Sequence, residues 1–199
     1  MATLIGDIHG KYKRYHEIIR EKDRHPYTVQ LGDFGFDYDT LKNVDPKNHV
    51  FIGGNHDNYA KINVVPNYLG DFGHMVDFDG LDFFYYRGAY SIDRMYRTIG
   101  LDWWEQEQVT VEEFEKAKQL YGSIKPDIVL THDCPESITS YLLPAGNKIY
   151  QNLTGYALQE LFQIHQPKIW VFGHYHISWN MKINGTDFTC LNELETKKI

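Results

Sequence analysis

Short apolar runs, separated by segments of helical spacing, occupy most of this 199-residue chain. The apolar runs, which predict strands, cover residues 2–5, 27–31, 49–52, 82–86, 127–130 and 168–172. Alternation of this kind is typical of domains built from layers of strands and helices. The hydrophobic pattern therefore predicts an α/β fold.

Three segments have the apolar spacing of a helix that packs along one face. One follows Gly10, and another begins near Thr154. The third opens at Thr110, where Glu113 completes the sequence of a capping box. The apolar faces of the first and last contain Tyr12, Tyr15, Ile18 and Ile19, and Leu158, Leu161 and Phe162. Near the end of the chain, alternation around the Asn-Gly pair at 184–185 predicts a hairpin.

Composition and charge narrow the classes of function. With 42% apolar and 24% charged residues, the chain has ordinary globular composition, and we expect one domain over residues 1–199. The net charge of -7 provides no general attraction to nucleic acid or to an anionic membrane. Two cysteines without a framework of spacings, and no apolar leader before the first motif, predict a reduced, cytoplasmic protein without a membrane span.

Residues that can bind metals recur where the predicted strands end. They occur in "GDIHG", "GDFG", "GNHD", "TH" and "GHYH", which begin at residues 6, 32, 54, 131 and 173. One such motif could be a polar turn and nothing more. In open α/β sheets, however, functional groups gather beyond the carboxyl ends of the strands. Five recurrences therefore predict that these turns converge on one site.

In this order, the motifs resemble those of the calcineurin-like metallophosphoesterases, over residues 7–176. The resemblance implies a four-layer fold, a β-sandwich flanked by helices, with two divalent metal ions at the sheet ends. It implies the following ligands: Asp7, His9 and His176 for the first ion, Asn55, His132 and His174 for the second, and Asp33 as the bridge. The segments "AYSIDRMYR" and "GLDWW" resemble small microbial members of the family.

The chemistry of these ligand types agrees with the resemblance. Imidazole nitrogens mixed with carboxylate and amide oxygens suit manganese, which we expect first, and also iron, zinc or nickel. Two such ions can share a hydroxide, lower its pKa and hold the attacking and leaving oxygens in line at phosphorus. Hydrolysis of a phosphate ester then needs no serine or cysteine nucleophile.

His56 follows the expected ligand Asn55, and the resemblance points it toward the substrate. An imidazole can protonate a leaving alkoxide, so His56 is the candidate general acid. A neighbouring carboxylate would fix its tautomer, and Asp57 is the candidate for that role. The alternative for Asp57 is a capping residue after the turn.

The loop regions bear on the substrate. Related Ser/Thr protein phosphatases have an arginine after the second motif, whereas Asp33 is followed here by "FGFDYD". Arg87, Arg94 and Arg97 flank a later loop, and Arg94 is our first choice for a phosphate clamp. Its alternative is an ordinary exposed arginine. Residues 134–153 form a long connection that predicts either a lid or a subunit interface.

Two classes of function follow. The first is a dinuclear-metal phosphoesterase acting on small phosphorylated molecules or nucleotides. A phosphodiesterase or nuclease acting on nucleic acid and a Ser/Thr protein phosphatase are its enzymatic alternatives. The second is a non-catalytic binding scaffold, which is disfavoured because all seven ligand positions and His56 are filled. The sequence does not determine the oligomeric state.

Overall fold

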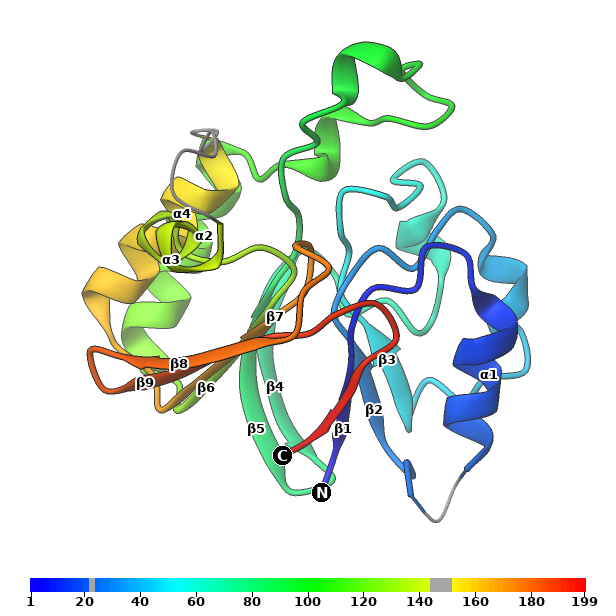
Figure 1. Cartoon of the computed structure of the whole chain (residues 1–199), viewed down its shortest axis with the longest axis horizontal. Helices are drawn as coiled ribbons and strands as arrows, with labels where there is room; N and C mark the ends of the chain where they lie inside the picture. Colours follow the sequence, from blue (N-terminus) through cyan, green and yellow to red (C-terminus); the bar gives the residue numbers. More distant parts are fainter. Residues whose placement is uncertain (22–23, 144–151) are drawn as a thin grey trace.

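The structure, a computed structural model, describes residues 1–21, 24–143 and 152–199. Within these residues, two β-sheets lie face to face with helices on both outer sides (Figure 1). The smaller sheet has the order β10-β1-β2-β3. Its strands are β1 (Thr3–Ile5), β2 (Thr28–Gln30), β3 (His49–Phe51) and β10 (Thr196–Lys198).

The larger sheet has the order β4-β5-β6-β7-β9-β8. Its strands are β4 (Phe72–Phe78), β5 (Leu81–Tyr86), β6 (Ile128–Thr131), β7 (Ile169–Phe172), β8 (Trp179–Ile183) and β9 (Thr186–Cys190). The α-helices of the described residues are α1 (Tyr12–Arg20), α2 (Val111–Ile124), α3 (Glu136–Leu142) and α4 (Leu153–Ile164). In Figure 1, α1 covers the smaller sheet, and α2, α3 and α4 gather on the outer side of the larger one.

Alternation along the strands produces these layers. On β1, the buried Leu4 belongs to the cluster between the sheets, whereas Ile5 packs with residues of α1. On β7, Val171 belongs to the cluster between the sheets, and Trp170 packs with residues of α2 to α4. Successive side chains of a strand point to opposite faces, so strands buried on both faces read as continuous apolar runs. This arrangement confirms the four-layer fold, a β-sandwich flanked by helices.

The six predicted strands, the three predicted helices and the C-terminal hairpin are all present. The capping box at the start of α2 is formed by Thr110 and Glu113 as expected. The helix expected near Thr154 starts one residue earlier and is capped by Asn152. The strands β4 and β10, the helix α3 and the short 3-10 helices, such as Glu105–Glu107, were not predicted. No helix among the described residues has the length and apolar character needed to cross a membrane.

Parallel pairing determines where the motifs meet. In the smaller sheet β1, β2 and β3 run parallel, and in the larger sheet β5, β6, β7 and β9 do so. The turns that follow them therefore lie along the same edge of the sandwich. The connection from β5 to α2, residues 87–110, rises above this edge at the top of Figure 1.

Candidate metal centre

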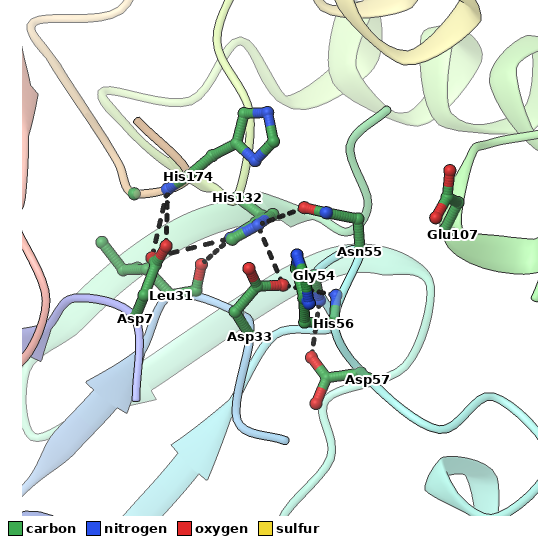
Figure 2. A network of polar contacts seen from close by, with 12 residues as sticks. Asp7, Leu31, Asp33, Gly54, Asn55, His56, Asp57, Glu107, His132 and His174 are labelled. Atoms are coloured by element: carbon green, nitrogen blue, oxygen red, sulfur yellow. Dashed lines mark hydrogen bonds and ion pairs between the residues drawn. The ribbon is translucent and has the colours of Figure 1, made fainter. Parts of the chain in front are cut away.

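The predicted ligands lie in turns at the carboxyl ends of five strands. Asp7 follows β1, Asp33 follows β2, Asn55 follows β3, His132 follows β6 and His174 follows β7. Figure 2 shows the side chains of Asp7, Asp33, Asn55 and His132 converging from these turns. The structure thus brings together motifs that are up to 167 residues apart in the sequence.

Four of the predicted ligand residues, in three of the turns, adopt an uncommon backbone conformation. His9, Asp33, His174 and His176 have φ angles of 47°, 56°, 67° and 53°. Few residues other than glycine adopt this left-handed region, and strain of this kind clusters at functional sites. The side chains at these positions are therefore best explained by their chemistry, because a glycine would form each turn more easily.

Two glycines allow the ligand turns to approach each other closely. A side chain at Gly54 would overlap Asp33 and His132, and a side chain at Gly173 would overlap Asp7. Since neither position can hold a Cβ atom without displacing a ligand, these glycines determine the spacing of the site.

The first group of ligand atoms comes from Asp7, His9, Asp33 and His176, and all lie within 4.8 Å of one another. His9 Nε2 and His176 Nε2 are 2.7 Å apart. His176 Nε2 also lies 3.1 Å from Asp7 Oδ2, and His9 Nε2 lies 3.5 Å from Asp33 Oδ2. We call this group the first metal position.

The second group of ligand atoms is centred on His132 Nε2. This atom lies 3.2 Å from Asp33 Oδ1 and 3.1 Å from Asn55 Oδ1. The other ring nitrogen, Nδ1, lies 2.7 Å from the carbonyl oxygen of Leu31, which can only accept, so Nδ1 carries a proton. We call the group of Asp33, Asn55 and His132 the second metal position.

The donor set of both groups fits divalent transition metals. At the second metal position, Nε2 of a neutral His132 would present its lone pair to the oxygens of Asp33 and Asn55. These three acceptor atoms would repel one another unless a proton or a cation lay between them. Asp7 and Asp33 are also buried, with exposed fractions of 0% and 1%. Buried carboxylates need compensating positive charge. Carboxylate, imidazole and amide ligands together suit manganese, iron, zinc or nickel.

The protonation equilibria show how strongly these groups interact. Burial opposes ionisation of Asp7, but hydrogen bonds with His176 and His9 hold its pKa below the usual value. Burial likewise opposes the charge on His132, yet Asp33 and Asp7 hold the pKa of this imidazole well above its usual value. Without metal, a proton on His132 therefore balances these carboxylates, and a bound cation would take over that function.

His174 is placed less closely than the other expected ligands. Its backbone N–H donates to both oxygens of Asp7 at 3.1 Å, and its ring centroid lies 5.1 Å from that of His132. In Figure 2 the His174 ring lies on the opposite side of His132 from Asp33. Its imidazole borders the cavity next to the site. Coordination by His174 therefore stays a prediction.

His56 lies beside the first metal position, and its role toward a substrate stays a prediction. Its ring centroid is 5.0 Å from that of His9, and its backbone N–H donates to Asp33 Oδ1 at 2.6 Å. Its Nε2 is 2.6 Å from Nη2 of Arg97. Burial, opposed by Asp33 and reinforced by Arg97, lowers the pKa of His56 to about 4.

The carboxylate of Asp57 was expected to contact and orient His56. Its contacts are instead with backbone N–H groups and with a tyrosine hydroxyl. It accepts from the N–H groups of Gly54 and Gly35, at 2.8 and 3.1 Å, and from the hydroxyl of Tyr38 at 3.1 Å. Burial and the nearby charge of Asp33 raise the pKa of Asp57 to about 7. These contacts join the turns of the second and third motifs. Asp57 is not a helix cap either, because no helix starts there.

The three loop arginines have different surroundings. Arg87 is buried and paired with Asp71 and Glu113, so it is structural. Arg94, our first choice for a phosphate clamp, is exposed, and its guanidinium lies 4.8 Å from the ring centre of Tyr90. Arg97 reaches His56, and its Nη1 is buried without a hydrogen-bond partner among the described residues. Its position beside His56 was not predicted.

Ser91 and Glu107 are two further residues of the site region that sequence reasoning missed. The Asn55 amide nitrogen donates to Ser91 Oγ at 3.0 Å, and Ser91 Oγ lies 2.7 Å from Glu107 Oε2. Burial raises the pKa of Glu107, although hydrogen bonds from Ser91 oppose this rise. Ser91 lies within the "AYSIDRMYR" segment, but no motif connects that segment to Asn55.

A cavity of about 630 Å³ opens beside the two metal positions. Its walls include the aromatic and aliphatic side chains of Tyr90, Ile92, Leu143 and Tyr175. Besides Asp33, three acidic residues border it, namely Asp93, Asp133 and Glu136. Cys134 also borders it, but burial raises the pKa of this thiol well above its usual value, which disfavours a thiolate nucleophile. Volumes of this size accommodate small-molecule ligands.

The predicted lid or interface, residues 134–153, is described only in part. Its first portion contains α3, and Glu136, Thr139 and Leu143 border the cavity. Residues 144–151 lie outside the described residues. Whether the segment is a lid or an interface therefore stays a prediction.

Comparison with solved structures identifies the fold. A putative 5'-nucleotidase from Staphylococcus aureus is 15% identical with a TM-score of 0.57, over 96% of this chain and 48% of its own. Phosphopantetheinyl hydrolase from Mycobacterium tuberculosis is 12% identical with a TM-score of 0.53, over 96% of this chain and 90% of its own. A dimetal phosphatase from Danio rerio is 12% identical with a TM-score of 0.50, over 97% and 88%. A search of curated proteins gives no match.

A family comparison on the sequence is more direct. The profile described as calcineurin-like phosphoesterase matches residues 2–178, which include every predicted ligand turn. The match agrees with the two-sheet architecture and with the Asp and His cluster of the first metal position. The chain therefore belongs to the calcineurin-like phosphoesterase family and is a metal-dependent hydrolase of phosphoric esters.

Proposed function

We propose that this protein binds two divalent metal ions and hydrolyses phosphate esters of small molecules or nucleotides. One observation carries the two-metal part of the proposal. The two oxygens of Asp33 face different groups, Oδ2 toward His9 and Oδ1 toward His132. A carboxylate with this arrangement can bridge two ions.

Seven residues would hold the ions. Asp7, His9 and His176 would bind the first, Asn55, His132 and His174 the second, and Asp33 both. Bound ions would supply Lewis acidity at the phosphoryl group and lower the pKa of the attacking water. Manganese is our first expectation, and iron, zinc and nickel are compatible with the same ligands.

The remaining residues near the site would orient the substrate and handle protons. His56 lies where its ring can reach the leaving oxygen of an ester held between the metal positions and the cavity. A bound phosphate adds negative charge beside this imidazole, which favours its protonated form. His56 would then donate a proton to the leaving alkoxide. Arg97 is the closest arginine to this position among the described residues.

The cavity supports a small substrate. Its volume of about 630 Å³ suits a nucleotide or a phosphorylated metabolite, and three acidic residues on its walls would repel a long polyanion. The chain is also acidic overall, with a net charge of -7. These features favour small esters over nucleic acid, and the absence of an arginine after Asp33 disfavours phosphoproteins.

Metal analysis combined with a substrate screen tests the proposal. Metal-free protein reloaded with manganese should bind two ions per chain, and chelator should abolish activity. The loaded protein should then be assayed with 5'-nucleotides, sugar phosphates, a nitrophenyl diester, a phosphopeptide and duplex DNA. We expect the small esters to be hydrolysed far faster than the peptide or the duplex. One bound ion, or faster cleavage of duplex DNA, would contradict the corresponding part of the proposal.

A further inference from the structure

A buried chain of three side chains leads away from the second metal position. Asn55 Nδ2 lies 3.0 Å from Ser91 Oγ, and Ser91 Oγ lies 2.7 Å from Glu107 Oε2. The backbone N–H of Ser91 also donates to Glu107 Oε1 at 3.0 Å. The exposed fractions of Ser91 and Glu107 are 1% and 0%. In Figure 2, Glu107 lies to the right of Asn55, on the side away from Asp7 and Asp33.

The direction of each hydrogen bond follows from the groups involved. An ionised carboxylate only accepts, so both oxygens of Glu107 accept from Ser91, one from N–H and one from Oγ–H. The hydroxyl has a single hydrogen, and its oxygen must then accept from Asn55. Consequently the Asn55 amide presents its NH₂ group to Ser91 and its oxygen to His132 Nε2, which lies 3.1 Å away.

Orientation matters because the two ends of an amide have opposite character. Only the amide oxygen can bind a cation, whereas the NH₂ group would repel it. The two orientations have nearly the same shape, so packing alone discriminates poorly between them. We propose that Glu107, acting through Ser91, is a positioning residue that holds the amide oxygen of Asn55 toward the second metal position. This inference rests on the proposed function, in which Asn55 is a metal ligand.

We call the chain of Asn55, Ser91 and Glu107 the relay. The surrounding backbone holds it against the turn that carries Asn55. The N–H of Gly88 donates to the carbonyl of Gly53 at 2.8 Å, next to the turn that carries Asn55. The N–H of Ala89 donates to the carbonyl of Glu107 at 3.0 Å. The start and the end of this loop are thus fixed to each other and to the Asn55 turn, so that the relay has little freedom to rearrange.

Glu107→Gln tests the relay because it should reverse the direction of the hydrogen bonds. The Ser91 N–H must keep an acceptor, so the glutamine oxygen faces it and the glutamine NH₂ donates to Ser91 Oγ. The hydroxyl hydrogen has then lost its acceptor on residue 107 and can be donated to Asn55, which favours the orientation that turns the amide oxygen away from the metal. We expect affinity for the second ion to fall by about 10- to 100-fold, the usual effect of losing an outer partner of a ligand. The first ion should be retained.

The measurement is a metal titration of chelator-treated protein by calorimetry, with bound manganese counted by elemental analysis. Electron paramagnetic resonance adds a readout independent of activity, because a coupled manganese pair should become a single-ion signal. Glu105→Gln is the matched control, since it removes the same charge from an exposed residue of the same short helix, Glu105–Glu107. This control should bind two ions with wild-type affinities.

Two further variants separate positioning from a general effect on folding. Ser91→Ala interrupts the relay without reversing it, so its loss should be smaller than that of Glu107→Gln. Asn55→Asp added to Glu107→Gln should restore binding of the second ion, because a carboxylate can accept from Ser91 and still present an oxygen to the metal. A residue that only supported the fold would give no such rescue.

The outcomes distinguish this inference from the function on which it rests. Two ions with wild-type affinities in Glu107→Gln would overturn the relay alone. Loss of the second ion without rescue by Asn55→Asp would also overturn it. A single ion bound by the wild-type protein would overturn the two-metal proposal and the relay with it.

Discussion

Solvent reaches both histidines of the first metal position, whereas the histidine and the asparagine of the second are buried. The exposed fractions of the His9 and His176 side chains are 19% and 45%. His132 is completely buried, and the exposed fraction of Asn55 is 4%. Both positions share Asp33, so the contrast lies in the other ligands.

The difference indicates two ways of orienting a ligand. At the first metal position the carboxylate of Asp7 could bind an ion equally well through either oxygen, and the left-handed backbone at His9 and His176 determines where their rings point. At the second, the amide of Asn55 has one useful atom, and the imidazole of His132 has one free nitrogen, so each needs a hydrogen-bond partner on its other side. We therefore expect changes of the exposed histidines at the first position to affect mainly metal binding, and changes of the buried residues at the second to affect stability as well.

The largest expected effect comes from Asp33→Asn, which removes the ligand common to both positions. An amide cannot bridge two cations, and one negative charge is lost from both. We expect both ions to bind poorly and kcat/KM to fall by at least about 1,000-fold, since metal assistance is worth several kcal/mol and about 1.4 kcal/mol is tenfold. Metal analysis and a nitrophenyl phosphate assay check this result. An active variant that holds both ions would remove the bridging role.

Stability measurements on His132→Ala and His176→Ala test the contrast itself. In the metal-free protein, His132 balances the buried charges of Asp33 and Asp7. Removing it should lower the free energy of unfolding by about 3 kcal/mol, as for a broken buried ion pair. His176 is half exposed, so its removal should cost less than about 1 kcal/mol. Urea unfolding in chelator gives both values, and equal losses would contradict the contrast between the two positions.

His56→Ala should separate proton donation from metal binding, because His56 is a ligand of neither position in the proposal. A nitrophenolate is a good leaving group and departs without being protonated, whereas an alkoxide must receive a proton to leave readily. We expect a loss of about 100-fold on an alkyl phosphate and only a small loss on a nitrophenyl ester, with both ions retained. His74→Ala, at an exposed histidine of β4, is the control and should change neither rate. Equal losses on the two esters would leave His56 as a positioning group.

The parts of the fold that were predicted from the sequence have strong local patterns, and the missed parts lack them. β10 is a three-residue edge strand defined by its pairing with β1. In β4 the register shifts between Met75 and Phe78, which interrupts the alternation that would have marked a strand. α3 is short and follows Pro135 within a connection that the sequence describes only as long. Each of these elements depends on partners elsewhere in the chain.

The same distinction applies to the site. The convergence of the expected ligands could be predicted because each lies in a short turn directly after an apolar strand, and their coordination of metal stays a prediction. The contacts of Ser91 and Glu107 depend on how the loop between β5 and α2 packs onto the Asn55 turn, over a sequence separation of 36 residues. Arg97 likewise reaches His56 across 41 residues. Neither contact leaves a spacing or a composition that the sequence alone could reveal.

The smallest effect that we predict distinguishes the two loop arginines. Arg97 lies beside His56 at the first metal position, its Nη2 also bonds Asp93 at 2.9 Å, and its buried Nη1 lacks a partner among the described residues. A phosphate oxygen near His56 would supply that partner. Arg97→Ala should therefore raise KM by about 10-fold, the value of one hydrogen bond to a charged group, while both ions stay bound. Arg97→Lys should recover part of this loss, because lysine keeps the charge without the planar fork.

Arg94 is exposed beside Tyr90, and Arg94→Ala should change KM by less than about twofold, as expected of a surface charge. A larger rise in KM for Arg94→Ala than for Arg97→Ala would return the clamp to Arg94 and leave Arg97 as a support for the loop.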